Sequence, residues 1–411
     1  MKSFGYVWIL AIASFCYCYF ISASIPKGLF RLLSLLPIIF LFTTLPLHLS
    51  AFHLCGLTAF LLVWLANFKL LLFSFGRGPL SPPQPLLHFI CTASLPIKIS
   101  QNPYPNSYKI TSPYSKTGQK VAFLIKALAL AALLKVYKYR QFLHPNVILA
   151  LYCCHVYLAA ELILALAAAP ARAIGLELEP QFNEPYLATS LQDFWGRRWN
   201  LMVSSILRPT IYFPIRGFTA SRLGPRCSHL LAMLAAFTVS GLMHEVIYYY
   251  LTRVTPTWEV TWFFVLQGVC TAAEVAAKKA AAGRWQLPPA VTRPLTVVFV
   301  AATGFWLFFP QLLRNHVDVK TIGEYSILLD FVKEKTLLPL SLYLQWYIIW
   351  WLCLIDRQVW PVILLVYFWW MEAFNVACES DIAPSSSNGI GRGFPCPTCD
   401  CEPFTPKFQT S

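Results

Sequence analysis

The stretch LLAMLAAFTVSGLMHEVIYYYL, residues 230–251, is an apolar run that contains one histidine and one carboxylate, His244 and Glu245. It is long enough to cross a membrane, because a spanning α-helix needs roughly 20 apolar residues. An ionisable side chain at membrane depth is expensive to desolvate, so it is a functional-site hypothesis by default. A histidine ring takes up and releases protons near neutral pH. The stretch therefore predicts a membrane helix that carries a candidate general base, His244.

The rest of the chain shares this apolar character. Of its 411 residues, 57% are hydrophobic and 12% are charged, whereas soluble domains carry about 25% charged residues. Apolar runs predict spans at 6–25, 29–48, 51–75, 121–137, 147–169, 229–251, 259–277, 294–312 and 337–355, and a short extra one at 359–374. We therefore expect an all-α polytopic membrane protein with about 8–10 transmembrane helices.

The first apolar run, 6–25, has only Lys2 before it, no clear small-x-small cleavage site, and a second apolar run directly after it. These features are not those of a secretory signal, so we expect a retained helix.

The net charge of +14 is spread among the apolar segments and does not form one basic domain. Such a distribution indicates membrane topology and anionic lipid head groups, and argues against nucleic-acid binding. If the N-terminus is lumenal, the cytosolic loops hold about twice as many Lys and Arg residues as the lumenal ones, as expected of membrane proteins. This orientation places residues 194–200 on the cytosolic side.

Two segments are not ordinary loops. Residues 76–118 are rich in Pro, Ser, Asn and Tyr, which predicts an irregular cytosolic segment at the membrane interface. Residues 172–226 mix aromatic, Arg and apolar residues, and their middle predicts a helix from Trp199 to Leu207 that ends before Pro209.

The thirteen cysteines do not form a disulfide framework, since most of them lie inside apolar runs. Cys396, Cys399 and Cys401 cluster near the end, without the four paired ligands of a structural zinc site. We expect no metal. We expect one membrane domain over 1–355, whose motifs lie at about 180–265, and an atypical tail over 356–411 with an extra span and then a disordered segment.

The helix around His244 presents a polar stripe, because residues three and four apart share a face. The stripe consists of Phe237, Ser240, Gly241, His244 and Tyr248. Its glycine allows another chain or a ligand to approach closely. Glu245 lies roughly 100° around the helix from His244 and is not its expected partner. The alternative is that His244 is a structural hydrogen-bonding residue between helices.

A second cluster, Phe194-Trp195-Gly196-Arg197-Arg198-Trp199-Asn200, precedes the stripe. An interfacial belt of aromatic residues with flanking arginines is the simpler interpretation. It does not explain Asn200, an amide that enters an apolar helix and whose donor suits a carbonyl or an oxyanion. Arg197 and Arg198 suit a phosphate-bearing ligand, since guanidinium groups match phosphate oxygens. The alternative for one of them is an ion pair with Asp193.

Motifs of several enzyme classes are absent from the sequence. It has no Gly-x-Ser-x-Gly elbow, P-loop, dinucleotide-binding fingerprint or His-Glu-x-x-His. Hydrolase, NTPase, dehydrogenase and zincin functions therefore lack support.

The two clusters together closely resemble the membrane-bound O-acyltransferases. They are Phe194–Asn200 with its continuation Leu-Met-Val-Ser-Ser-Ile-Leu-Arg-Pro, and Ser240-Gly-Leu-Met-His-Glu245. Within that family the sequence looks most like the plant wax synthase branch, which also includes an acyl-CoA sterol acyltransferase. The resemblance covers roughly residues 1–350, and the tail departs from the usual ending of the family.

The resemblance implies a multi-pass enzyme of the endoplasmic reticulum that joins an acyl group from acyl-CoA to an alcohol, without a metal or another cofactor. It implies that His244 is the catalytic histidine and Asn200 the second signature residue. The aromatic residues Phe194, Trp195 and Trp199 then lie where acyl-CoA enters. Ser240 and Tyr248, on the His244 stripe, are further candidate substrate contacts.

The expected reaction is direct attack of a long-chain fatty alcohol on the thioester, with His244 as general base. A sterol is the alternative acceptor, because residues that look alike in sequence set the shape of an apolar pocket. A membrane transporter with His244 as a proton relay is the alternative from another class. It predicts paired ionisable residues and interrupted helices, and neither pattern is found in the sequence. The sequence leaves the oligomeric state open.

Overall fold

The computed structural model describes residues 2–99, 116–280 and 287–336. Apart from an isolated bridge between Ile99 and Leu178, the regular structure in these ranges is helical. The first elements are α1 (Lys2–Phe20), η1 (Ser22–Ser24), α2 (Leu29–Thr44), η2 (Leu45–His48), α3 (Phe52–Thr58), η3 (Ala59–Ala66), α4 (Asn67–Ser74) and α5 (Leu86–Ser94).

The remaining elements run through the two motifs to the last described helix. The middle elements are α6 (Lys116–Val136), η4 (Tyr137–Phe142), α7 (Pro145–Ala167), α8 (Ala169–Ala173), η5 (Pro185–Leu187), α9 (Leu191–Asp193), η6 (Phe194–Arg198), α10 (Leu201–Leu207) and η7 (Arg208–Tyr212). The last elements are α11 (Phe213–Thr252), α12 (Glu259–Ala280), α13 (Pro289–Thr303), η8 (Gly304–Phe308), α14 (Pro310–Arg314) and α15 (Val317–Thr336).

Seven helical stretches in the described ranges are long and apolar enough to cross a membrane. They are Ser3–Ser24, Leu29–His48, Phe52–Ser74, Pro145–Ala173, Leu201–Thr252, Glu259–Ala280 and Pro289–Phe308. Each overlaps a predicted span, which confirms the all-α polytopic fold. The span predicted at 121–137 is helical as part of α6 but is not one of the seven. Those predicted at 337–355 and 359–374 lie outside the described residues, as do the proposed tail and its cysteines.

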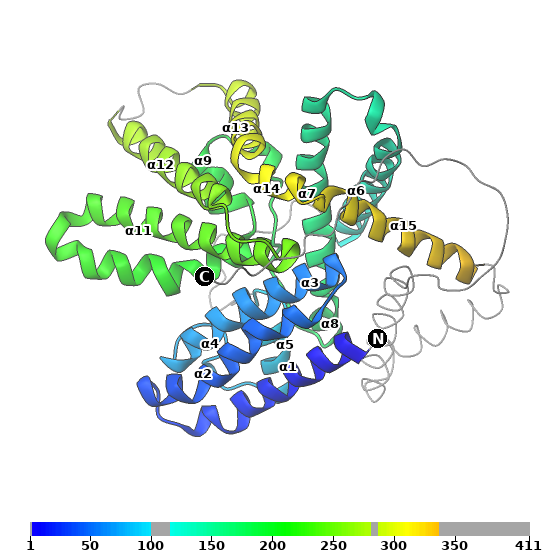
Figure 1. The fold of residues 1–411 in the computed structure, drawn as a ribbon. Helices are drawn as coiled ribbons and strands as arrows, with labels where there is room; N and C mark the ends of the chain where they lie inside the picture. The colour runs from blue at the N-terminus through cyan, green and yellow to red at the C-terminus, as the bar shows by residue number, and fades with distance from the viewer. Residues whose placement is uncertain (1, 100–115, 281–286, 337–411) are drawn as a thin grey trace, which may run out of the picture.

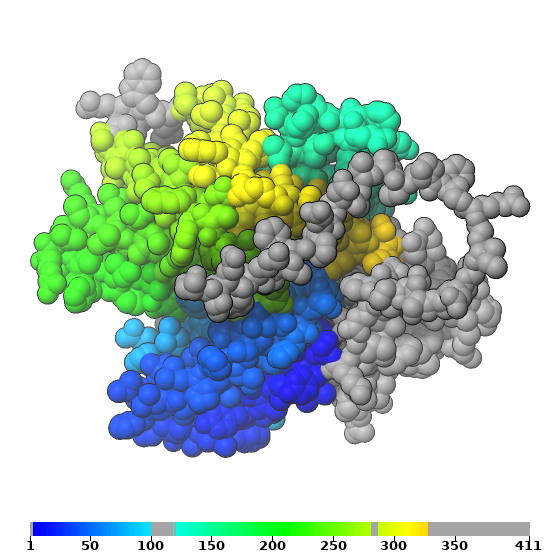
Figure 2. Space-filling view, viewed as in Figure 1, coloured from blue at the N-terminus to red at the C-terminus, as the bar shows by residue number. Residues whose placement is uncertain are grey.

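The first five helices pack together at one side of the molecule, drawn in blue in Figure 1 and along the lower edge of Figure 2. Their shared core includes Phe15 and Phe42, whose rings lie 5.0 Å apart. The buried Lys69 of α4 donates to the carbonyl oxygens of Thr92 and Leu95, both at 2.7 Å. This cation satisfies carbonyl groups at the C-terminal end of α5, and so fixes the irregular segment to the membrane helices.

The predicted α-helix ends at Leu207 as expected, but Pro209 does not end the helical path. The chain continues after α10 as the π-helical turn η7 and then as α11. Pro209 stands in the first turn of η7, where a missing N–H group is tolerated. The actual break comes at Gly224, whose φ of 73° and ψ of 166° are not helical. Figure 1 shows the resulting hairpin of two antiparallel segments within α11.

The second segment of α11 crosses α12 at very close range. A Cβ atom at Gly241 would lie 2.9 Å from the Cα and 3.1 Å from the carbonyl oxygen of Thr261. A Cβ atom at Gly268 would lie 2.9 Å from the Cβ of Phe237. Only glycine permits this backbone approach, so the glycine on the predicted stripe is a helix-packing residue. The crossing brings Phe264 of α12 against His244.

We expect Gly241→Ala to destabilise the protein by about 1–3 kcal/mol, because overpacking a tight helix crossing forces backbone shifts. The measurement is thermal unfolding of the detergent-solubilised protein. Gly217→Ala is the matched control on the same helix, since no atom lies within 4 Å of a Cβ at that position. Equal melting temperatures for the two variants would contradict the close crossing.

Candidate active site

A cavity of about 450 Å³ lies between η3, η6, α10, η7, α11 and α12. It brings together residues from both sequence motifs, although these motifs are separated by about forty residues. Five of the predicted site residues line it: Trp195, Trp199, Asn200, Ser240 and His244. The two signature residues, Asn200 and His244, therefore line the same cavity from different helices.

The ring of His244 is held in one tautomer by its own helix. Its Nδ1–H donates to the carbonyl oxygen of Ser240, one turn earlier, at 2.7 Å. This bond leaves the lone pair on Nε2, so the free nitrogen is a proton acceptor. Aromatic rings surround the imidazole: Phe264 at 4.2 Å between ring centroids, Trp64 at 5.1 Å and Phe308 at 6.0 Å. The geometry provides an oriented base in an apolar setting.

The side chain of Asn200 caps α10 through its oxygen and leaves its amide N–H groups free to donate. It is the N-cap of α10, and its Oδ1 accepts from the backbone N–H of Val203 at 3.2 Å. Its φ of 38° lies in the left-handed region, which asparagine tolerates better than most residues. Because Oδ1 is occupied by a donor, the amide nitrogen Nδ2 is the polar atom left for the cavity. Within the described residues Nδ2 has no hydrogen-bond partner.

Trp195 forms one wall of the cavity and is fixed by a polar chain behind it. Its Nε1–H donates to Oε1 of the buried Gln267 at 3.1 Å, and Nε2 of Gln267 donates to Oγ1 of Thr303 at 2.8 Å. The Thr303 hydroxyl donates in turn to the carbonyl oxygen of Phe299 at 2.8 Å. Every link has a defined direction, since an indole can only donate. The chain ties η6 to α12 and α13.

Two other predicted site residues, Phe194 and Tyr248, have supporting positions, and Glu245 faces away from His244 as expected. Phe194 is buried and stacks on Trp199, with ring centroids 5.5 Å apart and planes 14° apart. Tyr248 is buried beyond His244 and donates its hydroxyl proton to the carbonyl oxygen of Phe308 at 2.9 Å, so it is outside the cavity lining. Glu245 points to α12, where Oε1 accepts from the backbone N–H of Thr261 at 3.3 Å, and it is not bonded to His244.

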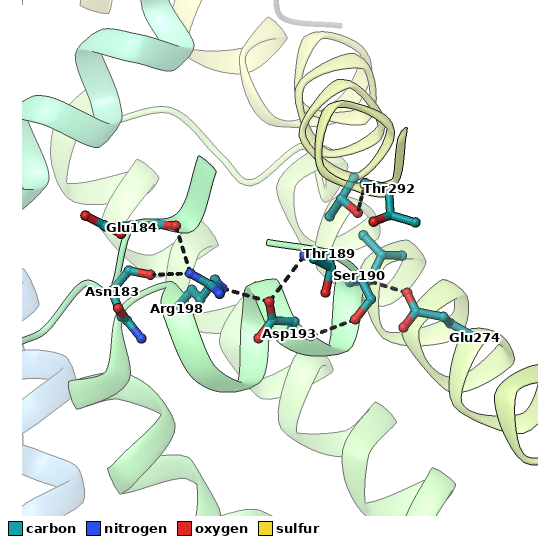
Figure 3. Close-up of polar contacts among 10 residues, drawn as sticks. Asn183, Glu184, Thr189, Ser190, Asp193, Arg198, Glu274 and Thr292 are labelled. Atoms are coloured by element: carbon teal, nitrogen blue, oxygen red, sulfur yellow. Dashed lines mark hydrogen bonds and ion pairs between the residues drawn. The ribbon is translucent and has the colours of Figure 1, made fainter. Parts of the chain in front are cut away.

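The two motif arginines do not line the cavity in the described structure. Arg197 is exposed, and Arg198 forms an ion pair with Asp193, whose Oδ2 lies 2.7 Å from Nε (Figure 3). The guanidinium groups that do line it belong to Arg208 and Arg216. Beside them lie Tyr212 and His229, which share a hydrogen bond of 2.6 Å. This end of the cavity is polar and basic, and the end at His244 is aromatic.

Comparison with known proteins identifies the family. The sequence model of the membrane bound O-acyl transferase family matches residues 178–266. The chain is 55% identical over 339 residues to a long-chain-alcohol O-fatty-acyltransferase of Simmondsia chinensis, covering 82% of this chain and 96% of the relative. The chain belongs to the membrane-bound O-acyltransferase family. Within it, the sequence groups with the plant wax synthase branch, as its motifs predicted.

Two more relatives of this O-acyltransferase come from Arabidopsis thaliana. A probable long-chain-alcohol O-fatty-acyltransferase 1 is 51% identical over 334 residues, 80% of this chain and 96% of the relative. An acyl-CoA–sterol O-acyltransferase 1 is 47% identical over 339 residues, 81% of this chain and 97% of the relative.

The O-acyltransferase also has site residues that sequence reasoning missed. Trp64 and Phe264 flank the catalytic candidate, and both line the cavity. Nothing local distinguishes them from other aromatic residues in apolar runs. Arg208 follows α10 in the motif continuation, and Arg216 follows it by eight residues, about two helical turns. Because the helix was predicted to end before Pro209, the sequence alone did not place these two arginines on one continuous helical stretch.

Proposed function

We propose that the protein transfers a fatty acyl group from acyl-CoA to the hydroxyl group of a long-chain alcohol, forming a wax ester in the endoplasmic reticulum membrane. The observation that carries the proposal is the orientation of His244, with Nδ1 bonded to Ser240 and Nε2 left as a base, in one cavity with Asn200. The similarity to long-chain-alcohol O-fatty-acyltransferases supports the acceptor class. The reaction as written needs no metal and no cofactor besides the acyl-CoA co-substrate.

In the proposed mechanism, Nε2 of His244 takes the proton from the alcohol as its oxygen attacks the thioester carbonyl carbon. The new C–O bond forms, the carbonyl oxygen becomes negatively charged, and Nδ2 of Asn200 donates a hydrogen bond to it. The C–S bond then breaks and coenzyme A leaves with its electron pair on sulfur. The aromatic rings around His244 keep water from competing with the alcohol.

The basic end of the cavity suits the phosphates of coenzyme A. Arg208 and Arg216 line the cavity and are exposed, so phosphate oxygens reach their guanidinium groups without a large desolvation cost. The acyl chain then extends toward the aromatic end, with the thioester between Asn200 and His244. The two ends of the cavity therefore match the two ends of the proposed donor.

We expect Arg216→Gln to raise the KM for acyl-CoA about threefold to tenfold with kcat unchanged, since one solvated hydrogen bond is worth ~0.5–1.5 kcal/mol. The measurement is initial-rate kinetics at varied acyl-CoA. Arg222→Gln is the control, because Arg222 lies over the Phe218 ring and is not among the lining residues. An equal rise in both variants would indicate a general charge effect and not a phosphate site.

The test of the function is an ester assay with microsomes that contain the protein. Labelled acyl-CoA is supplied with a long-chain alcohol in one arm and with a sterol in the other. We expect labelled wax ester in the first arm. Preferential labelling of the sterol would favour the acceptor named for the sterol acyltransferase relative. No ester in either arm would contradict an acyltransferase function and leave the transporter hypothesis.

A further inference from the structure

We propose that Arg198 is a positioning residue. Together with Asp193 it forms a clamp that fixes Asn200 at the cavity, and it does not bind the phosphates of the donor. This inference rests on the proposed acyl transfer, in which Asn200 contacts the reacting thioester. The clamp is the ion pair between Nε of Arg198 and Oδ2 of Asp193 at 2.7 Å, with both side chains less than a quarter exposed. Figure 3 shows the two side chains facing each other across one turn of η6.

A second nitrogen of the Arg198 guanidinium, Nη1, is also occupied. Its Nη1 donates to the carbonyl oxygens of Asn183 and Glu184, at 3.2 and 3.3 Å. One guanidinium therefore joins the segment before the motif to the motif itself. A phosphate group that approached it would meet the Asp193 carboxylate, a like charge, at hydrogen-bonding distance. Arg198 thus makes the contacts of a scaffold, with a carboxylate already beside its charge.

The segment that Arg198 holds is bonded on both sides of Asn200. The carbonyl oxygen of Arg198 accepts from the N–H of Asn183 at 2.9 Å, and the N–H of Leu201 donates to the carbonyl oxygen of Gln181 at 2.8 Å. Asn200 lies between these two bonds, with its φ of 38°. A residue in such a sparsely populated conformation persists only where its surroundings over-determine it. The clamp supplies that constraint.

The other side of the clamp is fixed to the membrane helices. Oδ2 of Asp193 also accepts from the N–H of Thr189 at 3.2 Å, and the N–H of Asp193 donates to Oγ of Ser190 at 3.1 Å. Directly after Ser190, the N–H of Leu191 donates to Oε2 of Glu274 on α12 at 2.7 Å (Figure 3). The position of α12, and of Phe264 against His244, is thereby transmitted to Asn200.

The test compares Arg198→Gln, Asp193→Asn, the double variant and Arg198→Lys in the ester assay with the full-length protein in membranes. A clamp predicts that each single variant lowers kcat about tenfold or more, since a charge-assisted hydrogen bond is worth ~1.5–3 kcal/mol. The KM for acyl-CoA stays within about twofold of wild type, because uniform donor binding is untouched. The double variant falls no further than the worse single variant, because both remove one interaction. Arg198→Lys recovers part of the lost kcat, since it keeps the charge but not the planar fork.

The outcome that overturns the proposal is a phosphate-ligand pattern. In that pattern Arg198→Gln raises the KM for acyl-CoA with kcat intact, and Asp193→Asn leaves both constants unchanged. Additive losses in the double variant would also overturn it. Arg222→Gln is the control for loss of one arginine charge and is expected to behave as wild type, because Arg222 lies over the Phe218 ring and is not among the lining residues. If Arg198→Gln does not accumulate, Arg198→Lys distinguishes the two roles. A lower kcat with an unchanged KM for acyl-CoA supports the clamp, and a higher KM with an unchanged kcat overturns it. Absence of ester from the wild-type protein contradicts the proposed function itself, whereas an active wild type with a phosphate-ligand pattern contradicts only the clamp.

Discussion

The His244→Ala variant is expected to form no measurable ester. Removing one positioned proton acceptor typically costs about 10²–10⁴-fold in rate. Among the described residues that line this cavity, the other imidazole is that of His229, which lies at the basic end and is bonded to Tyr212. The protein should still insert into membranes, because the imidazole contributes one hydrogen bond to its own helix. The measurement is labelled ester formation in microsomes at matched protein level.

Two further variants make this result specific. His244→Asn keeps an amide donor near the position of Nδ1 and so retains the Ser240 contact, but it has no base; we expect it to be as inactive as His244→Ala. His48→Ala is the matched control, because His48 is exposed at the end of η2 and away from the cavity lining. Turnover at the wild-type rate in His244→Ala would exclude general-base catalysis by this residue.

Asn200→Asp is expected to lower kcat by about 10²–10³-fold while the protein remains folded. Aspartate keeps an oxygen that accepts from the N–H of Val203, and it tolerates the left-handed conformation. It replaces the free Nδ2 donor with a second oxygen that repels the developing oxyanion, and losing one oxyanion donor costs about that factor. The measurements are kcat in the ester assay and melting temperature of the solubilised protein.

Asn200→Gly separates the backbone from the side chain at the same position. Glycine removes both the cap and the donor but adopts a positive φ without strain. We therefore expect low activity with only a small loss of stability. Asn146→Asp, at an exposed position beside the start of α7, is the matched control for the amide-to-acid change. An Asn200→Asp variant as active as wild type would demote Asn200 to a helix cap.

The membrane fold was largely predictable from apolar run length, because crossing hydrocarbon requires a fixed length of helix regardless of its neighbours. The internal irregularities were not. Pro209 looked like a helix end, yet the chain passes through it as a π turn, while Gly224 provides the break. Either residue could interrupt a helix: proline lacks the N–H group that a helix interior needs, and glycine adopts a positive φ easily. The choice between them depends on how α11 packs on its neighbours.

The sequence predicted the site residues that line the cavity better than those that form hydrogen bonds or ion pairs with other residues around it. Asn200 and His244 were inferred together, and the structure places both at one cavity. For Arg198 the sequence left two roles open, a phosphate ligand or the ion-pair partner of Asp193, and the structure shows the ion pair. Tyr248 lies on the same helix stripe as His244, but its hydroxyl group donates to the carbonyl oxygen of Phe308, sixty residues later. A pairing across sixty residues depends on the tertiary fold and cannot be inferred from local sequence.

The bond between His244 and the Ser240 carbonyl has a chemical consequence for the proposed reaction. A backbone carbonyl orients the ring but brings no negative charge, and in the described part of the chain no carboxylate is bonded to this imidazole. The imidazolium formed when the alcohol is deprotonated therefore has no permanent counter-ion. An opposite charge arises in the reaction itself, first on the oxyanion and then on the departing sulfur. The proton thus passes to the thiolate, and each product release returns a neutral ring to the next alcohol.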